Sequence, residues 1–186
     1  TLNTVYPSIK SLPNLKNGKI FYLTSKSTQK AVALNAMEQL EKKGLRAKTA
    51  EITAKEKSCI LDKPKCNPKD CPYALNYYDK LRTVVRQMLI ENTIMTKETF
   101  RKYAEQHTVC PFELSLDISL FADMVICDYN YVFDPHAALK RYFEASSPRG
   151  DFIFLVDESH NLPERSRQMY SEQMTLPRTA AMKILA

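Results

Sequence analysis

Two carboxylates and a histidine directly follow a short apolar run near the end of the chain. The run extends from Phe152 to Val156, and Asp157, Glu158 and His160 come after it. An apolar run of this length without alternation predicts a buried strand in the centre of a parallel sheet. At the carboxyl end of such a strand, an aspartate can hold the magnesium of a nucleotide, and a following glutamate can orient or deprotonate a water. The pattern is that of a Walker B motif.

The same residues also fit a strand that leads into a helix with an acidic first turn, where carboxylates favour the helix dipole. Taken alone, Asp157 and Glu158 support the two interpretations equally. Residues elsewhere in the chain must decide between them.

A second group of residues with possible chemistry consists of four cysteines, separated by six, four and thirty-eight residues. They are Cys59, Cys66, Cys71 and Cys110. Four thiolates with irregular spacing suit an iron–sulfur cluster or a four-cysteine zinc site, although a zinc ribbon usually brings its ligands as two close pairs. Ordinary buried thiols are the alternative, but three of the four lie in a polar, lysine-rich loop, whereas buried cysteine normally has apolar neighbours. Cys127 ends an apolar run, and we expect it to be a packed thiol.

Aromatic and basic residues give a weaker indication of nucleic-acid binding. Tyr129 and Tyr131 follow a predicted strand and fit either stacking on the bases of a single strand or packing in the core. Residues 41–70 hold nine Lys or Arg against five Asp or Glu. Such a stretch can bind a phosphate backbone or form a solvated charged face.

Length and composition set the bounds. With 186 residues, 44% of them apolar, the chain suits one compact domain, or one domain with an insertion. The formal charge of +6 favours an anionic partner, although only weakly. No apolar run approaches the ~20 residues of a membrane span, and the N-terminus has no signal-peptide pattern, so we expect a cytosolic protein. Five cysteines in that compartment suggest metal or redox chemistry rather than disulfides.

Apolar periodicity predicts the elements that must position these residues. We expect strands at 19–24, 46–52 near a sheet edge, 124–127 and 152–156, and helices at 1–12, from 27 to about 43, and at 73–90, 97–105 and 112–121. Gly44 is the expected C-cap of the second helix. This alternation predicts a doubly wound α/β sheet.

These motifs, in this order, resemble the first motor domain of the XPD/DinG family of iron–sulfur DNA helicases, most closely its DinG-like bacterial members. The resemblance rests on three segments: KIFYLTSKST at 19–28, which is similar to motif Ia, the four-cysteine segment from Ser58 through VCPFELSLD, and ADMVICDYNYVFDP leading to LVDESHNL at 155–162. One departure is Ser159, where the family usually has alanine.

The resemblance implies a role for each candidate residue. The four cysteines named above would ligate a [4Fe-4S] cluster. Asp157 and Glu158 would serve Mg²⁺ and water activation, and His160 would couple the nucleotide state to DNA binding. In relatives, a Gly-Lys-Thr phosphate loop runs into a helix similar to TLNTVYPSIKSL, so Thr1 is expected to bind magnesium together with Asp157. The expected DNA contacts are Thr24, Ser25, Lys26, Tyr129 and Tyr131.

The resemblance also implies a fold: a partial RecA-like parallel sheet with helices on both faces, interrupted by a small, mostly helical iron–sulfur domain. Residues 1–54 and 111–162 would form the motor domain, 55–110 the cluster domain, and 163–186 the start of an arch-type helical insertion. The phosphate loop and a second motor lobe do not occur in this sequence. We therefore expect this piece alone to be inactive.

The expected function of the full-length protein is ATP-driven 5′-to-3′ translocation on single-stranded DNA, with unwinding of forked duplex DNA. The resemblance suggests a monomer in the bacterial cytoplasm with no membrane contact. Two alternatives remain open. One is a zinc-containing nucleic-acid-binding module without ATPase activity, and the other is a redox sensor that uses the cluster for electron transfer.

Overall fold

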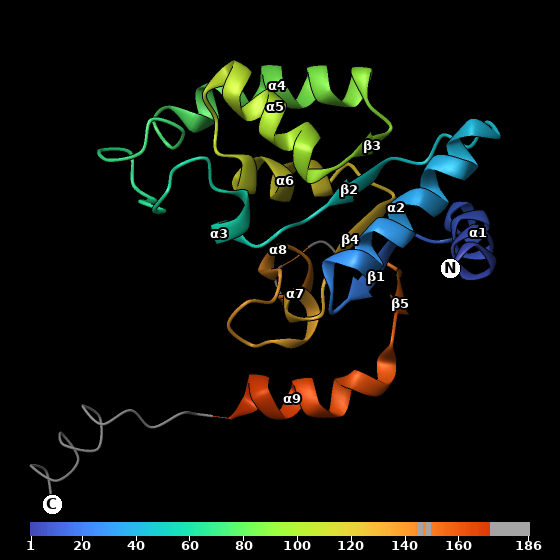
Figure 1. Cartoon of the computed structure of the whole chain (residues 1–186). Coiled ribbons are helices and arrows are strands. Elements are labelled where there is room, and N and C mark those ends of the chain that lie inside the picture. The colour runs from blue at the N-terminus through green and yellow to red at the C-terminus, as the bar shows by residue number, and fades with distance from the viewer. Residues whose placement is uncertain (145–146, 148–149, 172–186) are drawn as a thin grey trace, which may run out of the picture.

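A five-stranded parallel sheet forms the centre of the protein (Figure 1). The computed structural model describes residues 1–144, 147 and 150–171. The strands are β1 (Lys19–Thr24), β2 (Thr49–Glu51), β3 (Ile94–Met95), β4 (Met124–Asp128) and β5 (Phe152–Val156), in the spatial order β3-β2-β4-β1-β5. All the pairings are parallel, so the carboxyl ends of the strands meet at one edge of the sheet.

Helices cover both faces of the sheet, because alternate side chains of β1 pack against helices on opposite faces. Ile20 and Tyr22 pack against α1 (Leu2–Ser11) and α2 (Ser27–Lys42) on one face. Phe21 and Leu23 point to the other face, because successive side chains of a strand alternate. That face is covered by α4 (Tyr77–Glu91), α5 (Lys97–His107), α6 (Pro111–Ser119) and α8 (Lys140–Phe143). The mixed α/β fold class expected from the sequence is therefore confirmed.

The remaining elements are short, apart from α9. They are η1 (Leu12–Asn14), α3 (Lys55–Ser58), α7 (Asn130–Phe133), η2 (Ser159–Asn161) and α9 (Leu162–Tyr170). In Figure 1, α9 runs along the lower side of the molecule, next to α7. Of the expected arch insertion at 163–186, residues 172–186 lie outside the described part of the chain.

The prediction that the strand at 152–156 is central and buried is wrong. Among the described residues, β5 pairs only with β1 and forms an edge of the sheet. Phe154 keeps 42% of its surface exposed. Helices cover both faces of a parallel sheet, so a strand has apolar side chains on both faces whether it is central or at an edge. Hydropathy alone therefore does not distinguish the two positions.

The cysteine-containing segment supplies a strand to the sheet and shares its hydrophobic core. It contributes β3 as the opposite edge of the sheet, so β2, the short strand expected near an edge, is second from that edge and has neighbours on both sides. Val84 and Met88 of α4 and Phe100 of α5 lie in the same buried cluster as Phe21 of β1. The predicted domain boundaries at 54–55 and 110–111 remain a prediction.

The helices of this segment differ slightly from those expected. α4 begins at Tyr77, four residues later than predicted, because Asn76 adopts a left-handed backbone conformation (φ 54°) that a helix cannot include. In the described part of the chain, no helix is both long and apolar enough to cross a membrane.

Candidate functional site

An acidic turn leaves the carboxyl end of β5. The Asp157 amide donates a hydrogen bond to the Leu23 carbonyl oxygen (2.9 Å), which continues the pairing with β1. Glu158 then adopts a left-handed conformation (φ 51°), and η2 follows at once. Left-handed backbone is unusual for a residue with a side chain, so the chain reverses sharply at the predicted catalytic glutamate.

The predicted magnesium residues Thr1 and Asp157 both affect the pKa of one tyrosine, Tyr22. Tyr22 is a buried residue of β1, next to β5. Burial raises its pKa, a hydrogen bond with Thr1 lowers it, and the charge of Asp157 and a hydrogen bond with its carboxylate raise it further. Thr1 is the N-cap residue of α1 and makes no side-chain capping bond. The structure therefore brings together two residues that are 156 positions apart in the sequence.

Tyr22 itself was not identified from the sequence. It lies within the apolar strand KIFYLT, where a tyrosine usually contributes to the core. Its nearness to the acidic turn follows from the register of β1 against β5, which pairs Tyr22 with Leu155, two residues before Asp157.

Glu158 and His160 face the solvent. Glu158 Oε2 lies 3.4 Å from His160 Nδ1, and these side chains are 47% and 73% exposed, respectively. Both side chains are therefore free to contact a nucleotide or another part of a longer protein.

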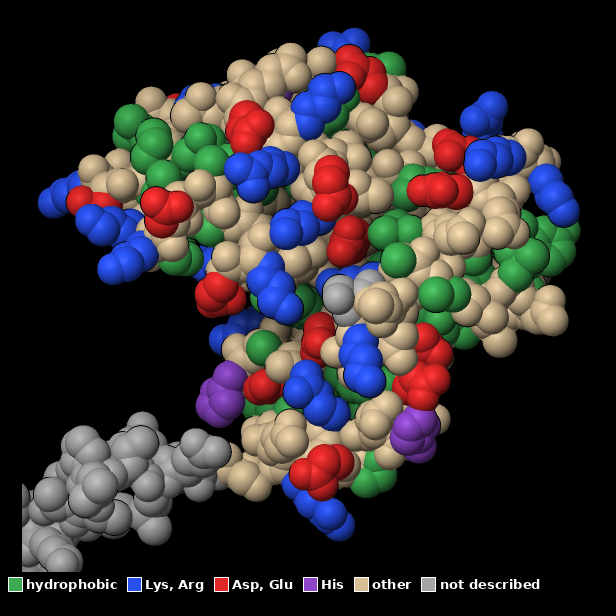
Figure 2. Space-filling model, viewed as in Figure 1, with side chains coloured by type: hydrophobic (Ala, Val, Ile, Leu, Met, Phe, Trp, Pro, Cys, Tyr) green, Lys and Arg blue, Asp and Glu red, His purple; other side chains and the backbone are tan. Residues whose placement is uncertain are grey.

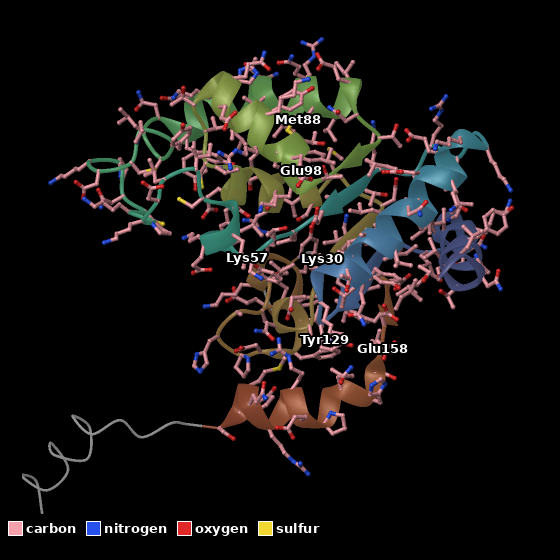
Figure 3. All side chains as sticks on the ribbon, viewed as in Figure 1. Lys30, Lys57, Met88, Glu98, Tyr129 and Glu158 are labelled. Carbon is pink, nitrogen blue, oxygen red and sulfur yellow. The ribbon has the colours of Figure 1, made fainter. Side chains whose placement is uncertain are left out.

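Tyr129 contacts this turn, and Figure 3 labels it beside Glu158. Its side chain is completely buried, and its hydroxyl donates to the carbonyl oxygens of Asp157 and Glu158, the latter at 3.2 Å. Burial raises the pKa of this hydroxyl, so it stays protonated and able to donate. A buried ring has no free face, which argues against the prediction that Tyr129 stacks on a DNA base.

A groove with a volume of about 850 Å³ opens at the same edge of the sheet, beside β1, β2 and β4. Its lining includes the predicted DNA contacts Ser25, Lys26 and Tyr131. Thr24 is buried, and its hydroxyl donates to the Lys26 carbonyl oxygen (3.4 Å), so its side chain supports the loop and does not face the groove. Tyr131 is half-buried, and burial raises its pKa.

The charges in the groove are mixed. Five lysines and four carboxylates line it: Lys26, Lys30, Lys55, Lys57, Lys97, Glu51, Glu56, Glu98 and Asp128. Figure 2 shows basic and acidic side chains interspersed over the face that contains it. Two of the carboxylates have partners within the protein, because Glu51 lies 3.9 Å from Lys30 and Asp128 lies 3.3 Å from Arg165.

Lys30 fixes the wall of this groove. Its ammonium group donates to the Ile52 carbonyl oxygen (2.7 Å), and Figure 3 labels Lys30 on α2 and Lys57 on α3. Burial lowers the pKa of Lys30, Glu51 opposes that effect, and the charge of Lys57 adds to it. Glu51 in turn accepts from the Lys97 amide (3.0 Å), so the pair ties α2 to β2 and to the start of α5, which lies within the cysteine segment.

The four predicted cysteine ligands line one cavity of about 210 Å³. Cys71 is buried, Cys59 and Cys110 are partly buried, and Cys66 is exposed. Burial raises the pKa of Cys110, whereas hydrogen bonds from the backbone amides of Glu113 and Phe112 lower it. Such amide donors favour a thiolate.

The four predicted ligands are thiols that line the same cavity. Thiolates are the ligands of iron–sulfur clusters and of many structural zinc sites. In the described residues, no group of three or more His, Cys, Asp or Glu side chains is arranged to hold a metal ion. Cys127 lies elsewhere, fully buried, and burial raises its pKa to about 12, as expected for a packed thiol.

The sequence model of the family DEAD_2 matches residues 2–178. The chain is 27% identical over 172 residues to "Regulator of telomere elongation helicase 1 homolog" of Caenorhabditis briggsae, covering 82% of the chain and 17% of that protein. It is 26% identical over 142 residues to "General transcription and DNA repair factor IIH helicase subunit XPD" of Schizosaccharomyces pombe, covering 73% of the chain and 17% of that protein.

A solved structure, "Truncated XPD", has a similar fold. The TM-score is 0.55 at 18% sequence identity, and the match covers 87% of this chain and 46% of that one. The chain thus spans about a sixth of the length of these curated relatives and less than half of the solved structure.

Proposed function

Because the chain belongs to the DEAD_2 family, we propose that it forms part of an ATP-dependent DNA helicase, contributing one side of the nucleotide site and part of the DNA path. One observation carries this proposal. Asp157 and Glu158 directly follow β5, at the carboxyl edge of a parallel sheet, and the Glu158 side chain is exposed there. Nucleotides bind at this edge in open α/β folds.

The chemistry follows from the positions of the two carboxylates. Asp157 and the Thr1 hydroxyl are suited to hold the Mg²⁺ of bound ATP, directly or through water. Glu158 then orients the attacking water and accepts its proton, while exposed His160 is free to report the nucleotide state to another part of the protein. The phosphate loop and the second motor lobe would come from elsewhere in the longer protein.

The groove beside the site is the proposed path of single-stranded DNA. Lys26 is exposed at its rim, and Ser25 and Tyr131 line it. Lysines in such a groove bind the phosphate backbone without reading its sequence, which gives strong salt dependence. Translocation in the 5′-to-3′ direction, unwinding at a fork, and action as a monomer in the bacterial cytoplasm are further parts of the proposal that rest on the family resemblance.

The proposed cofactor of residues 55–110 is a [4Fe-4S] cluster held by Cys59, Cys66, Cys71 and Cys110. When bound, such a cluster cross-links its four thiolate ligands through iron. Here it would fasten the loop at 59–71 to the start of α6, and α9 would begin the arch insertion. Iron and acid-labile sulfide in anaerobically purified protein would support this assignment, whereas stoichiometric zinc without sulfide would exclude it.

Substitution of Glu158 tests the proposed hydrolysis. In the full-length protein, Glu158→Gln should lower the kcat of DNA-dependent ATP hydrolysis by roughly 100-fold or more, because Gln keeps the size but loses the base. The matched control is Glu164→Gln on α9, an exposed glutamate that forms an ion pair with Arg167 at 3.5 Å within the same helix. Hydrolysis that survives Glu158→Gln would refute the Walker B role.

Substitution of Lys26 tests the DNA path. Lys26→Ala should weaken single-strand binding similarly for all sequences and lower the log–log salt slope by about 1. Lys43→Ala, at the far end of α2, is the control for loss of charge. Unwinding of substrates with only a 5′ or only a 3′ single-stranded tail reports the direction.

A further inference from the structure

Tyr129 makes contacts that base stacking and simple core packing do not explain. It follows β4, and its amide donates to the Thr24 carbonyl oxygen at the end of β1 (3.2 Å). Its hydroxyl donates to the backbone carbonyl oxygens of both Asp157 and Glu158 after β5. A single residue thus links the carboxyl ends of three neighbouring strands.

The turn that Tyr129 contacts is held in an unfavourable backbone conformation. Glu158 has a left-handed φ of 51°, which a residue with a Cβ atom adopts only when its surroundings impose it. Three donors meet at the Glu158 carbonyl oxygen: the Tyr129 hydroxyl (3.2 Å), the Asn161 amide (2.9 Å) and Asn161 Nδ2 (3.1 Å). Of the three, only Tyr129 comes from outside the turn, and it ties the turn to the sheet.

The segment that carries Tyr129 is itself fixed on both sides. Its neighbours Asp128 and Asn130 both accept from Arg165 Nη2 on α9, at 3.3 and 3.1 Å. Asp128 and Asn130 also line the groove. A shift of the groove wall would therefore be transmitted to Tyr129, and through its hydroxyl to the acidic turn.

From these contacts we infer that Tyr129 is a positioning residue for ATP hydrolysis: its hydroxyl holds the backbone of Asp157 and Glu158 and links it to the wall of the DNA groove. This inference rests on the proposed function. It assigns Tyr129 a role without contact to DNA or nucleotide. Phenylalanine would fill the same buried space, so the hydroxyl alone carries the role.

The test compares two substitutions in the full-length protein that each remove one buried hydroxyl. Tyr129→Phe should lower the kcat of DNA-stimulated ATP hydrolysis about tenfold and change the KM for ATP by less than about twofold, because Glu158 acts only in the transition state. Tyr142→Phe is the control. It removes a hydroxyl that shares a hydrogen bond with Ser119 (2.8 Å) in the core and makes no contact with the turn. Its kcat should remain at the wild-type value.

A second variant guards against misfolding of Tyr129→Phe. Asn161→Ala removes one of the donors to the same carbonyl oxygen from a partly exposed position, and it should lower kcat in the same direction by a smaller factor. Three results would overturn the inference. They are an unchanged kcat in Tyr129→Phe, a fall of kcat in Tyr142→Phe as large as that in Tyr129→Phe, and a KM for ATP in Tyr129→Phe that rises by the same factor as its kcat falls. Glu158→Gln, measured in parallel, distinguishes this failure from failure of the proposed function, since only the latter leaves Glu158→Gln active.

Discussion

A buried lysine at the start of β1 holds the end of a helix. Lys19 Nζ donates to the carbonyl oxygens of Ser119 (2.9 Å), Leu120 (3.4 Å) and Ala122. These carbonyls lie at and just beyond the C-terminus of α6, where backbone acceptors have no partner within the helix. Burial lowers the pKa of Lys19 to about 8, with Asp123 opposing that effect. The lysine therefore satisfies three acceptors at the cost of a buried charge.

This shift predicts a pH dependence of stability. Above the folded-state pKa of about 8, the unfolded chain still binds a proton at this lysine that the folded chain has lost, so the contribution of Lys19 to stability rises with pH. Between about pH 8 and 10, that contribution should increase by at most about 2 kcal/mol, whereas Cys127, whose pKa is raised by burial, contributes in the opposite direction. Urea titrations of the wild type and of variants over this range separate the two. Lys19→Met should lower the slope of the free energy of unfolding against pH, whereas Lys16→Met, at an exposed position, should not. An unchanged slope in Lys19→Met would contradict the assignment.

Three helices meet at one carboxylate. Asp117 of α6 accepts from the Tyr77 hydroxyl of α4 (2.7 Å) and from Arg141 Nη1 of α8 (2.9 Å). Burial and the adjacent Asp117 raise the pKa of Tyr77, so the hydroxyl remains a donor at neutral pH. Tyr77 also lines the cysteine cavity. The carboxylate thus connects the proposed cluster region to the helix that precedes β5.

Removing one donor should weaken this junction measurably. Tyr77→Phe should lower the free energy of unfolding by about 1–2 kcal/mol, because a hydrogen bond to a charged acceptor is lost. Asp117→Asn should cost more, because it weakens both contacts. Urea unfolding of the two single variants and the double variant gives the coupling energy. Additive losses would show that the two residues do not interact.

The elements were predicted more accurately than their arrangement. The bounds of β1 agree with the sequence, because Gly18 and Ser25 delimit a continuous apolar run. The edge position of β5 was not predictable, because strand order depends on pairings distant in sequence. β3, with two residues, is too short to give a periodic signal.

The candidate site shows the same division. Asp157, Glu158 and the cysteines were identified by residue type and spacing, but the roles of Tyr22 and Tyr129 depend on where each hydroxyl points. For Tyr22 that direction follows from the register of β1 against β5. For Tyr129 the direction of the hydroxyl follows from the turn between β4 and α7, whose conformation the hydropathy pattern does not predict.

At the scale of the whole molecule, the cysteine-bearing segment and the sheet share one core. Met88 of α4 and Tyr103 of α5 belong to the same buried cluster as Ala50 of β2 and Val125 of β4. Residues 62–70, in contrast, are exposed. The helices are held by burial of apolar surface, whereas the loop between the first three cysteines has little packing of its own.

Loss of the proposed cluster should therefore be local. Cys71→Ser in the full-length protein should speed amide hydrogen exchange in residues 59–76 and leave β1, β4 and the centre of α4 protected. Hydrogen exchange followed by mass spectrometry resolves these segments. Cys127→Ser, a buried thiol outside the cavity, is the matched control and should not affect the loop selectively. Global loss of protection in Cys71→Ser would show that the cluster supports the entire fold.

The open side of β5 has a practical consequence for anyone who purifies this stretch of protein by itself. Among the described residues, nothing pairs with the side of β5 that faces away from β1, and Phe154 is partly exposed there. An apolar, uncharged edge strand is a template for pairing with another copy, so aggregation should increase as the protein concentration rises. Phe154→Lys would place a charge on this strand, which should reduce edge-to-edge aggregation, but it would remove the ring stacking with Phe21.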